Sequence, residues 1–304
     1  MTDSLKRVIC LGFFDGIHIG HAGILDAGVR MADRLSVPAV VLTFDKHPMS
    51  VITGEQVPLL SGFEARMALL SGFPGISEVI VLPFNEVLAA MEWEDFFKEI
   101  LIQRYKARGL VSGFDYSFGA GGRGRAEQLI TACRSQDICC EILPAVEIGG
   151  IKVSSSYIRS LILAGRVDEA AVFLGRPVEI AGTVEEGRHI GRKLGFPTIN
   201  MRLEDGVCVP RYGVYISETS IEGDYMPSIT NIGLRPTLSD GRAAVETHIL
   251  GGDHGNAYGK PAKVRILRFL RDEIMFETPE KLHAQVKRDI ERAGEWFEKR
   301  EVEL

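Results

Sequence analysis

Residues 12–21, with the sequence GFFDGIHIGH, constrain this chain more than any other stretch. They follow an apolar run at 8–11 that predicts a buried first strand, and they precede a pattern typical of a helix. Glycines in such a turn let the backbone approach a ligand closely, because they carry no Cβ atom. A helix that begins there directs its free N–H groups and its positive dipole end toward the turn, which favours a bound phosphate.

The two histidines of this stretch suggest chemistry. If residues from 17 onward are helical, His18 and His21 are three apart and share one face of the helix. Two imidazoles beside phosphate-binding amides suit an anionic transition state. An ordinary glycine turn with two solvent-facing histidines explains a bare HxGH about as well, but the whole ten-residue string favours a ligand site.

This string resembles the signature of nucleotidyltransferases with a HIGH-type motif. Its longer form, GxFDGxHxGH, resembles that of the bacterial bifunctional riboflavin kinase/FAD synthetase family. The resemblance implies that His18 and His21 are catalytic. It further implies nucleotide-binding roles for Gly12, Phe13, Asp15 and Gly20.

Composition limits the alternatives. The 304 residues suffice for two domains with separate cores, and 45% hydrophobic with 25% charged residues is the balance of a soluble globular protein. A net charge of −6 gives no support to a nucleic-acid or anionic-membrane partner. No secretory apolar region follows the N-terminus, and no stretch approaches the roughly 20 apolar residues that cross a bilayer. The five cysteines form no CxxC pair, which predicts reduced thiols and a cytoplasmic location.

From residue 7 to about 145, apolar runs alternate with amphipathic patterns. This alternation predicts βαβ units, and therefore a parallel sheet with helices on both faces. We expect strands at 8–13, 39–44, 79–82, 109–111 and 139–143, and helices around 21–34, 62–72, 93–107 and 126–136. Ligands of such sheets bind beyond the carboxyl ends of the strands, which is where the glycine turn lies.

Two other strand ends carry unusual strings. Residues 43–48, TFDKHP, follow the second strand; a plain loop explains them equally well, whereas the resembled family lines its flavin side with this segment. Residues 119–124 satisfy the dinucleotide fingerprint GxGxxG, but a polar, aromatic stretch separates them from the preceding strand, so we reject that fold. The resemblance implies instead that Asp115 positions the nucleotide and that the glycines form a mobile flap.

Residues 154–159, SSSYIR, open a predicted helix. Serines cap helix N-termini, and hydroxyl groups beside an arginine can hold a phosphate. The string resembles the SSTxIR motif of the same family, a counterpart of the mobile KMSKS-type loop. It implies that Ser155, Ser156 and Arg159 bind the nucleotide.

The organisation of the chain changes near residue 176. One more helix is expected at 166–173, and Gly175 and Pro177 end it. We therefore expect two domains: an adenylyltransferase (FAD synthetase) domain at 1–176 and a riboflavin kinase domain at 177–304. In the second, short strands at 178–184, 213–219, 226–232, 243–250 and 262–270 predict an antiparallel barrel or sandwich, followed by a helix that Thr278 caps.

A second motif occupies residues 182–200. It is rich in glycine and basic residues but lacks the GK[ST] of a Walker A loop, and it resembles the flavokinase signature GxVxxG…GRxLGFPTxN. The resemblance implies nucleotide contacts from Gly182, Gly191 and Arg192, and ligation of the magnesium–ATP unit by Thr198 and Asn200. Their side-chain oxygens are the hard ligands that magnesium prefers. Ile199 stands where the family usually has alanine, so we expect a crowded site.

Glu246 interrupts an apolar strand, and an acidic residue at such a position calls for an explanation. A structural ion pair is one explanation; the family resemblance implies another, in which Glu246 is the general base for a flavin hydroxyl. His248 lies two residues on and faces the same side of the strand. Arg271 and Phe276 match flavin-side positions of the family, while residues 251–254, GGDH, depart from its usual DFD-like turn.

The two resemblances together imply a bifunctional enzyme that converts riboflavin and ATP to FMN, and then FMN and ATP to FAD and pyrophosphate. ATP, riboflavin and FMN are the expected partners, with Mg²⁺ entering alongside ATP. Two alternatives stay open: a HIGH-type nucleotidyltransferase for another acceptor with a flavin-sensing second half, and a flavin-binding regulatory protein without catalysis. The intact motif residues, His18, His21, Thr198, Asn200 and Glu246, argue against both.

Overall fold

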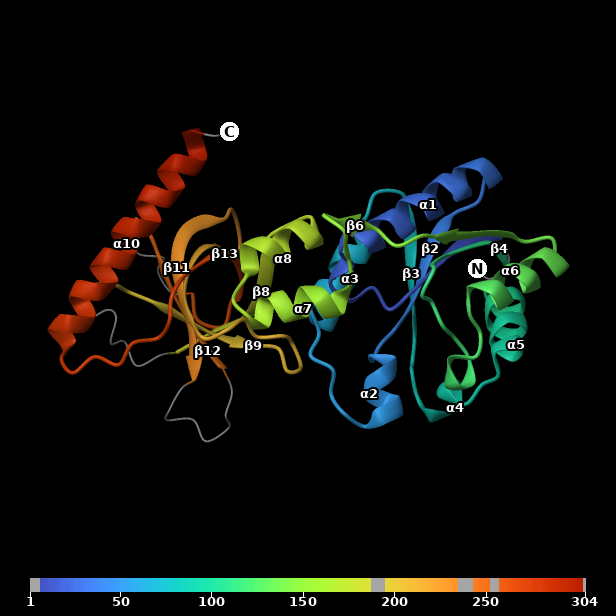
Figure 1. Cartoon of the computed structure of the whole chain (residues 1–304), viewed down its shortest axis with the longest axis horizontal. Coiled ribbons are helices and arrows are strands. Elements are labelled where there is room, and N and C mark those ends of the chain that lie inside the picture. Colours follow the sequence, from blue (N-terminus) through green and yellow to red (C-terminus); the bar gives the residue numbers. More distant parts are fainter. Residues whose placement is uncertain (1–5, 187–194, 235–242, 252–256, 303–304) are drawn as a thin grey trace. The chain divides into compact units, whose positions relative to one another are not determined.

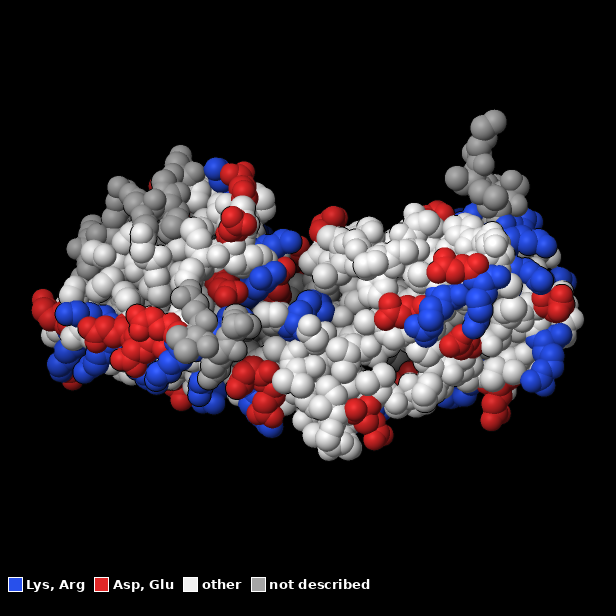
Figure 2. All heavy atoms as spheres, turned by 90° about the horizontal axis from the view of Figure 1, so that it is seen from above, with Lys and Arg blue, Asp and Glu red and all other residues white. Residues whose placement is uncertain are grey.

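Figure 1 shows the computed structural model, which describes residues 6–186, 195–234, 243–251 and 257–302. The chain forms two compact units, residues 1–155 and 156–304. Acidic and basic side chains lie interspersed on the face of Figure 2, in keeping with the modest net charge of −6.

The first unit is built on a five-stranded parallel sheet with the order β3-β2-β1-β4-β5, as the alternation of strands and helices predicted. Its strands are β1 (Arg7–Leu11), β2 (Ala39–Phe44), β3 (Ile76–Leu82), β4 (Ala107–Gly113) and β5 (Cys139–Leu143). The predicted end of the first strand at Phe13 is wrong. β1 ends at Leu11, because the Phe13 carbonyl accepts hydrogen bonds from the side chains of Thr43 and Arg66 instead of a neighbouring strand.

Helices cover both faces of this sheet. The helices of this unit are α1 (Ile19–Leu35), α2 (Pro48–Thr53), α3 (Phe63–Ser71), α4 (Glu86–Ala89), α5 (Trp93–Asp95), a π-helical stretch (Phe96–Arg104) and α6 (Ala126–Ser135), and a small hairpin of β6 (Glu147–Ile148) and β7 (Ile151–Lys152) completes it. The helix expected around 93–107 is present, but it is π-helical over Phe96–Arg104 and ends at Arg104, before the predicted end. A wide turn places residues about five apart on one face, which lets Phe96 and Leu101 both enter the core.

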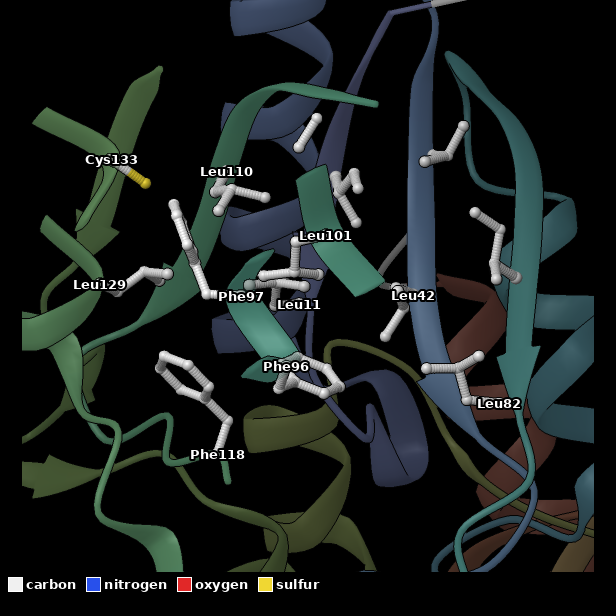
Figure 3. Packing of buried hydrophobic residues seen from close by; sticks show 14 of the residues in the cluster. Leu11, Leu42, Leu82, Phe96, Phe97, Leu101, Leu110, Phe118, Leu129 and Cys133 are labelled. Carbon is white, nitrogen blue, oxygen red and sulfur yellow. The ribbon is translucent and has the colours of Figure 1, made fainter. Parts of the chain in front are cut away.

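Two hydrophobic cores sandwich the sheet. Successive residues of a strand point to opposite faces, so Ile9 and Leu11 of β1 enter one core while Val8 and Cys10 enter the other. Figure 3 shows the first core, in which leucines of neighbouring strands meet Phe96 and Phe97 of the π-helical stretch. The sheet is therefore fixed from both sides, and its carboxyl edge is a rigid base for a ligand site.

The second unit contains a closed barrel with the order β10-β11-β12-β9-β8-β13, so the barrel prediction is confirmed and the sandwich alternative is wrong. Its elements are α7 (Ser155–Leu163), α8 (Val167–Leu174), β8 (Val178–Glu185), β9 (Ile199–Leu203), β10 (Gly213–Ile221), β11 (Met226–Leu234), β12 (Ala243–Ile249), β13 (Pro261–Arg271) and α10 (Pro279–Val302). The sequence analysis missed β9, which pairs with both β8 and β12 and closes the barrel.

A row of five buried hydroxyl groups crosses the barrel interior. In order they belong to Thr219, Ser228, Ser217, Thr230 and Thr247, and neighbouring oxygens lie 2.8, 2.8, 2.7 and 2.9 Å apart. All five side chains are almost fully buried. The row thus gives each buried hydroxyl a hydrogen-bond partner, without which its burial would destabilise the barrel.

Helix α10 packs on the outer face of the barrel, as its apolar stripe predicted. Ala293 is buried against Ile216 of β10 and Ile229 of β11. The guanidinium of Arg271, at the end of β13, donates two hydrogen bonds to Asp289 of α10, at 2.7 and 2.9 Å. Since Asp289 is only 1% exposed, this ion pair fixes α10 to the barrel more firmly than a surface pair would.

Candidate functional site

The turn after β1 has a strained backbone. Phe14 and Ile17 both have positive φ angles, 59° and 40°, which residues with side chains rarely adopt. Gly16, with φ of 73°, packs against Leu60 so closely that a Cβ atom would lie 2.7 Å from its side chain. Strain of this kind persists only where surrounding contacts impose it, and it clusters at ligand sites.

His18 begins helix α1 instead of lying within it. The condition that residues from 17 onward are helical is not met, because Ile17 is held in a 3-10 turn and α1 starts at Ile19. His18 is the N-cap: its Nδ1 accepts a hydrogen bond from the backbone N–H of His21 at 3.2 Å. The N–H groups of Ile19 and Gly20 therefore point out of the first turn toward the site.

The two imidazoles nevertheless lie together, as the spacing predicted. Their rings stack with centroids 3.6 Å apart and planes 12° from parallel, and Phe14 packs edge-on against His21 at 5.3 Å. Two stacked imidazoles at a helix N-terminus can present N–H donors to one anion. This is an arrangement suited to a phosphate group that gains charge during reaction.

Asp15 and Ser155 connect two motifs that are far apart in the sequence. The buried Asp15 carboxylate accepts a hydrogen bond from the Leu60 N–H at 2.8 Å, and its backbone carbonyl accepts one from the Ser155 hydroxyl at 3.0 Å. The Ser155 hydroxyl thus contacts the glycine turn. Ser156 is exposed on α7 and Arg159 is half-buried there.

Sequence reasoning missed Arg66, which is fully buried beneath the turn. Its guanidinium donates to the carbonyls of Phe13 and Phe44 at 2.7 Å each and to the Thr43 hydroxyl at 3.0 Å, and it lies 4.0 Å from the Phe13 ring centroid. Burial lowers the pKa of Arg66 to about 10, although Asp15 and Asp45 oppose the shift. Its place four residues before the buried Leu70 of α3 was a signal that it faces inward.

The TFDKHP segment is more than a plain loop. The Asp45 carboxylate accepts hydrogen bonds from the Lys46 and Phe84 N–H groups at 2.8 and 2.7 Å. His47 caps the unpredicted helix α2, with its ring 4.8 Å from that of Phe13. The segment therefore adjoins the glycine turn.

Asp115 lies just beyond β4, next to β1 in the sheet. Its carboxylate is 2.9 Å from the Lys152 ammonium, which also lies 4.2 Å from the Phe114 ring centroid. Residues 119–124 turn back on themselves through a bridge between Phe118 and Gly124, and α6 follows at Ala126, after the fourth strand of the chain. They do not join a first strand to its helix, which agrees with the rejection of a dinucleotide fold.

In the barrel, Glu246 of β12 sits between two asparagines. It lies directly opposite Asn200 of β9 on one side and Asn231 of β11 on the other. Directly opposite residues of antiparallel strands have Cβ atoms about 4.5–5.5 Å apart, so the three polar side chains form one row on the outer face. Within the described part of the chain, the Glu246 carboxylate makes neither an ion pair nor a hydrogen bond.

His248 lies on the same outer face, two residues along β12. Its Nδ1 is 2.8 Å from the carbonyl oxygen of Pro197, and its ring lies 5.8 Å from that of Phe196. These contacts hold the segment before β9 against β12. His248 therefore fixes the approach to Thr198, which is exposed, and to Asn200, which is 7% exposed.

Some of the other predicted kinase residues lie in the described part of the chain and some do not. Gly182 lies in β8, where a Cβ atom would come within 2.0 Å of the Arg202 carbonyl oxygen, so close strand packing already requires glycine there. Gly191 and Arg192 fall outside the described residues, as do residues 252–254 of the departing GGDH turn. Arg271 is engaged with Asp289, and Phe276 is half-buried in the segment before α10.

Comparison with known proteins assigns each half of the chain to a family. The FAD synthetase family matches residues 1–157, and the riboflavin kinase family matches residues 174–297. The sheet-based half and the barrel half thus define the class: a nucleotidyltransferase unit followed by a flavokinase unit.

Whole-length relatives combine the same two halves. The chain is 35% identical over 287 residues to the bifunctional riboflavin kinase/FMN adenylyltransferase of Pseudomonas fluorescens, covering 94% of this chain and 91% of that protein. It is 31% identical to the protein of the same name from Listeria monocytogenes, covering 98% and 94%. The chain belongs to the family of bifunctional riboflavin kinases/FMN adenylyltransferases.

One solved structure matches the whole fold. A crystal structure described as a macrolide-efflux protein from Streptococcus pneumoniae has a TM-score of 0.87 and 30% identity, covering 97% of this chain and 98% of the other. Across the described residues of our chain, no helix has the length and apolar character needed to pass through a membrane.

Proposed function

We propose that this chain makes FMN from riboflavin and ATP in its barrel half, and FAD and pyrophosphate from FMN and ATP in its sheet half. Membership of the family supports both activities and their order along the chain. We place the functional boundary near residue 176, between α8 and β8, and the protein in the cytoplasm, with neither nucleic acid nor membrane as a partner.

The observation that carries the adenylyltransferase assignment is the stacked pair His18 and His21 at the start of α1. In the proposed reaction a phosphate oxygen of FMN attacks the α-phosphorus of ATP, and the bond to pyrophosphate breaks. His18, His21 and the amides of α1 stabilise the added negative charge. Gly12, Phe13, Asp15 and Gly20 shape the turn, and Asp115, Ser155, Ser156 and Arg159 stay predicted nucleotide contacts.

In the kinase half, the opposition of Glu246 and Asn200 supports a phosphoryl-transfer site. A riboflavin hydroxyl attacks the γ-phosphorus of ATP, and Glu246 accepts its proton as the bond to ADP breaks. The lack of a cationic partner for Glu246 among the described residues favours this role over that of a structural ion pair. Gly182, Gly191, Arg192, Arg271 and Phe276 stay predicted ligand contacts of this half.

Thr198 and Asn200 would hold Mg²⁺ that arrives with ATP. Asn200 of β9 lies opposite Glu246, and Thr198 precedes β9 by one residue, two positions before Asn200. Within the described residues no group of three or more acidic, histidine or cysteine side chains could hold a metal by itself. A few side-chain oxygens supplemented by phosphates and water suit Mg²⁺, which neutralises phosphate charge.

One incubation tests the proposal. Riboflavin, ATP and magnesium are mixed with the purified chain, and the products are separated by chromatography; we expect FMN first and FAD later. FAD made only from supplied FMN would mean that the barrel is a sensor. Release of pyrophosphate with a different acceptor would mean another nucleotidyltransferase, and absence of turnover would indicate a regulatory protein.

A further inference from the structure

A second carboxylate, that of Glu273, lies beside the polar row of the barrel. Its Oε1 is 3.5 Å from the Nδ2 of Asn231, the residue that faces Glu246. The same carboxylate lies over Gly233: a Cβ atom there would be only 1.9 Å from Oε1 and 2.5 Å from Cδ. Glycine at 233 therefore provides the space in which Glu273 rests.

The residues next to Glu273 in the sequence hold it in this place. Two ion pairs anchor the residues just before it: Arg271 bonds to the buried Asp289, and Asp272 lies 2.6 Å from Arg211. Glu273 itself has no cationic partner among the described residues. Its charge is thus directed at the Asn231 amide and is not neutralised by an ion pair.

A carboxylate can only accept hydrogen bonds, whereas an amide offers an accepting oxygen and a donating nitrogen. Asn231 must therefore turn its Nδ2 toward Glu273. Its Oδ1 is then directed away from Glu273, free to accept a hydrogen bond from an alcohol. An oriented acceptor beside a proposed general base suits the polyhydroxyl chain of a flavin.

We propose that Glu273 is a positioning residue of the kinase half, which fixes the Asn231 amide so that its oxygen binds a hydroxyl group of riboflavin next to Glu246. This inference rests on the proposed kinase activity. Gly233 is required for the same positioning, because any side chain there displaces the Glu273 carboxylate.

The test compares Glu273→Met, which keeps the shape but removes the acceptor, with Glu273→Gln, which keeps an acceptor. We expect Glu273→Met to lower kcat/KM for riboflavin about tenfold, the worth of one hydrogen bond to a charged group, while KM for ATP stays unchanged. Glu273→Gln should retain most of the activity. Glu277→Met is the matched control, because Glu277 pairs with the exposed Lys281 in the same segment.

A double-mutant cycle tests the geometry. Gly233→Ala should lower kcat/KM for riboflavin by a similar factor, because the new methyl group pushes the carboxylate away. In the Glu273→Met background the same change should cost much less than it does alone, since no carboxylate is left to displace. FMN adenylylation by each preparation and its melting temperature report on folding.

The outcomes distinguish a failure of the proposed kinase function from a failure of the proposed role of Glu273. If the unmodified chain makes no FMN from riboflavin, the proposed kinase function fails. If it does, and Glu273→Met leaves kcat/KM for riboflavin unchanged, the positioning role is overturned. Equal losses for riboflavin and ATP with a lower melting temperature would show that Glu273 only stabilises the barrel, and would also overturn it.

Discussion

Glu246 of β12 lies directly opposite Asn200 of β9, so the acid of one motif meets the amide of another across a strand pair. The contact depends on β9 pairing with both β8 and β12. Closure of the barrel therefore assembles the proposed kinase site, and any change that opens the barrel at β9 should remove activity before it removes folding.

Glu246→Gln should reduce kinase turnover by roughly 10²–10⁴, the usual contribution of a general base. This corresponds to about 3–5 kcal/mol of barrier, at about 1.36 kcal/mol per tenfold. Riboflavin binding, the melting temperature and adenylylation of supplied FMN should be unchanged. The test is to measure steady-state rates of both reactions on one preparation. Full kinase turnover would mean that another group accepts the proton. Loss of both rates with a lower melting temperature would mean that Glu246 has a structural role.

His21→Ala should slow the conversion of FMN to FAD by about 10²–10³, because one preorganised stabiliser of developing charge is lost. Phosphorylation of riboflavin should continue at its normal rate. The aromatic contact with Phe14 is also lost, so a second variant, His21→Gln, controls for packing. An unchanged rate of FAD formation in both variants would remove His21 from the mechanism.

Replacing Arg66 with methionine should destabilise the sheet-based unit by roughly 2–4 kcal/mol, since the Phe44 carbonyl loses its bond to the guanidinium and the Phe13 carbonyl keeps only the bond from Thr43. Arg66→Lys should recover only part of this, because one ammonium cannot reach both carbonyls in the planar geometry of a guanidinium. Thermal unfolding followed by calorimetry measures the change. Arg108→Met is the control, an arginine whose partner, Asp137, is fully exposed; an unchanged melting temperature for Arg66→Met would show that the buried bonds contribute nothing.

A fragment of residues 177–304 should fold and make FMN but no FAD, since the barrel has its own core. The structure suggests a longer comparison fragment, 156–304, because α7 and α8 form a compact unit with the barrel. Val167, Phe173 and Leu174 are buried in that unit, so we expect the longer fragment to melt higher. A folded but inactive fragment 156–304 would contradict the kinase assignment, whereas inactivity of 177–304 alone would move the boundary.

Ser217→Ala should destabilise the barrel by roughly 1–3 kcal/mol, because Ser217 joins two neighbours in the hydroxyl row and both lose a buried partner. Thr219→Val should cost less, since Thr219 ends the row and its hydroxyl, among the described residues, is hydrogen-bonded to Ser228 alone. Denaturant unfolding of both variants gives the comparison. An equal or reversed order would mean that the hydroxyls find other partners inside the barrel.

Much of the fold follows from the sequence because alternation and periodicity mark the faces of strands and helices. The bounds of β2 and β5 are those predicted, and so is the capping of α10 by Thr278, which accepts a hydrogen bond from the Lys281 N–H. β9 was missed because it begins at the end of the glycine-rich flavokinase string, whose composition indicates a loop.

The sites were harder to predict than the elements. Motifs identified His18, His21 and Glu246 as site residues. Hydrophobic periodicity does not determine which strands pair, so the position of Glu246 opposite Asn200 could not be predicted. Arg66 carried no motif, and a charged residue on a helix is ordinarily solvated. Its role depends on two carbonyls that only tertiary folding brings within its reach.

The hydroxyl row inside the barrel has a consequence for its protons. Five hydroxyl groups carry five protons, but the row has only four contacts, and each contact uses one proton. One hydroxyl must therefore accept from its neighbours and send its own proton to a group outside the row. Passing this role to the next hydroxyl requires only that two neighbouring O–H bonds rotate, with no movement of carbon, nitrogen or oxygen. The heavy atoms of the barrel interior are thus fixed, while the orientation of its dipoles is not.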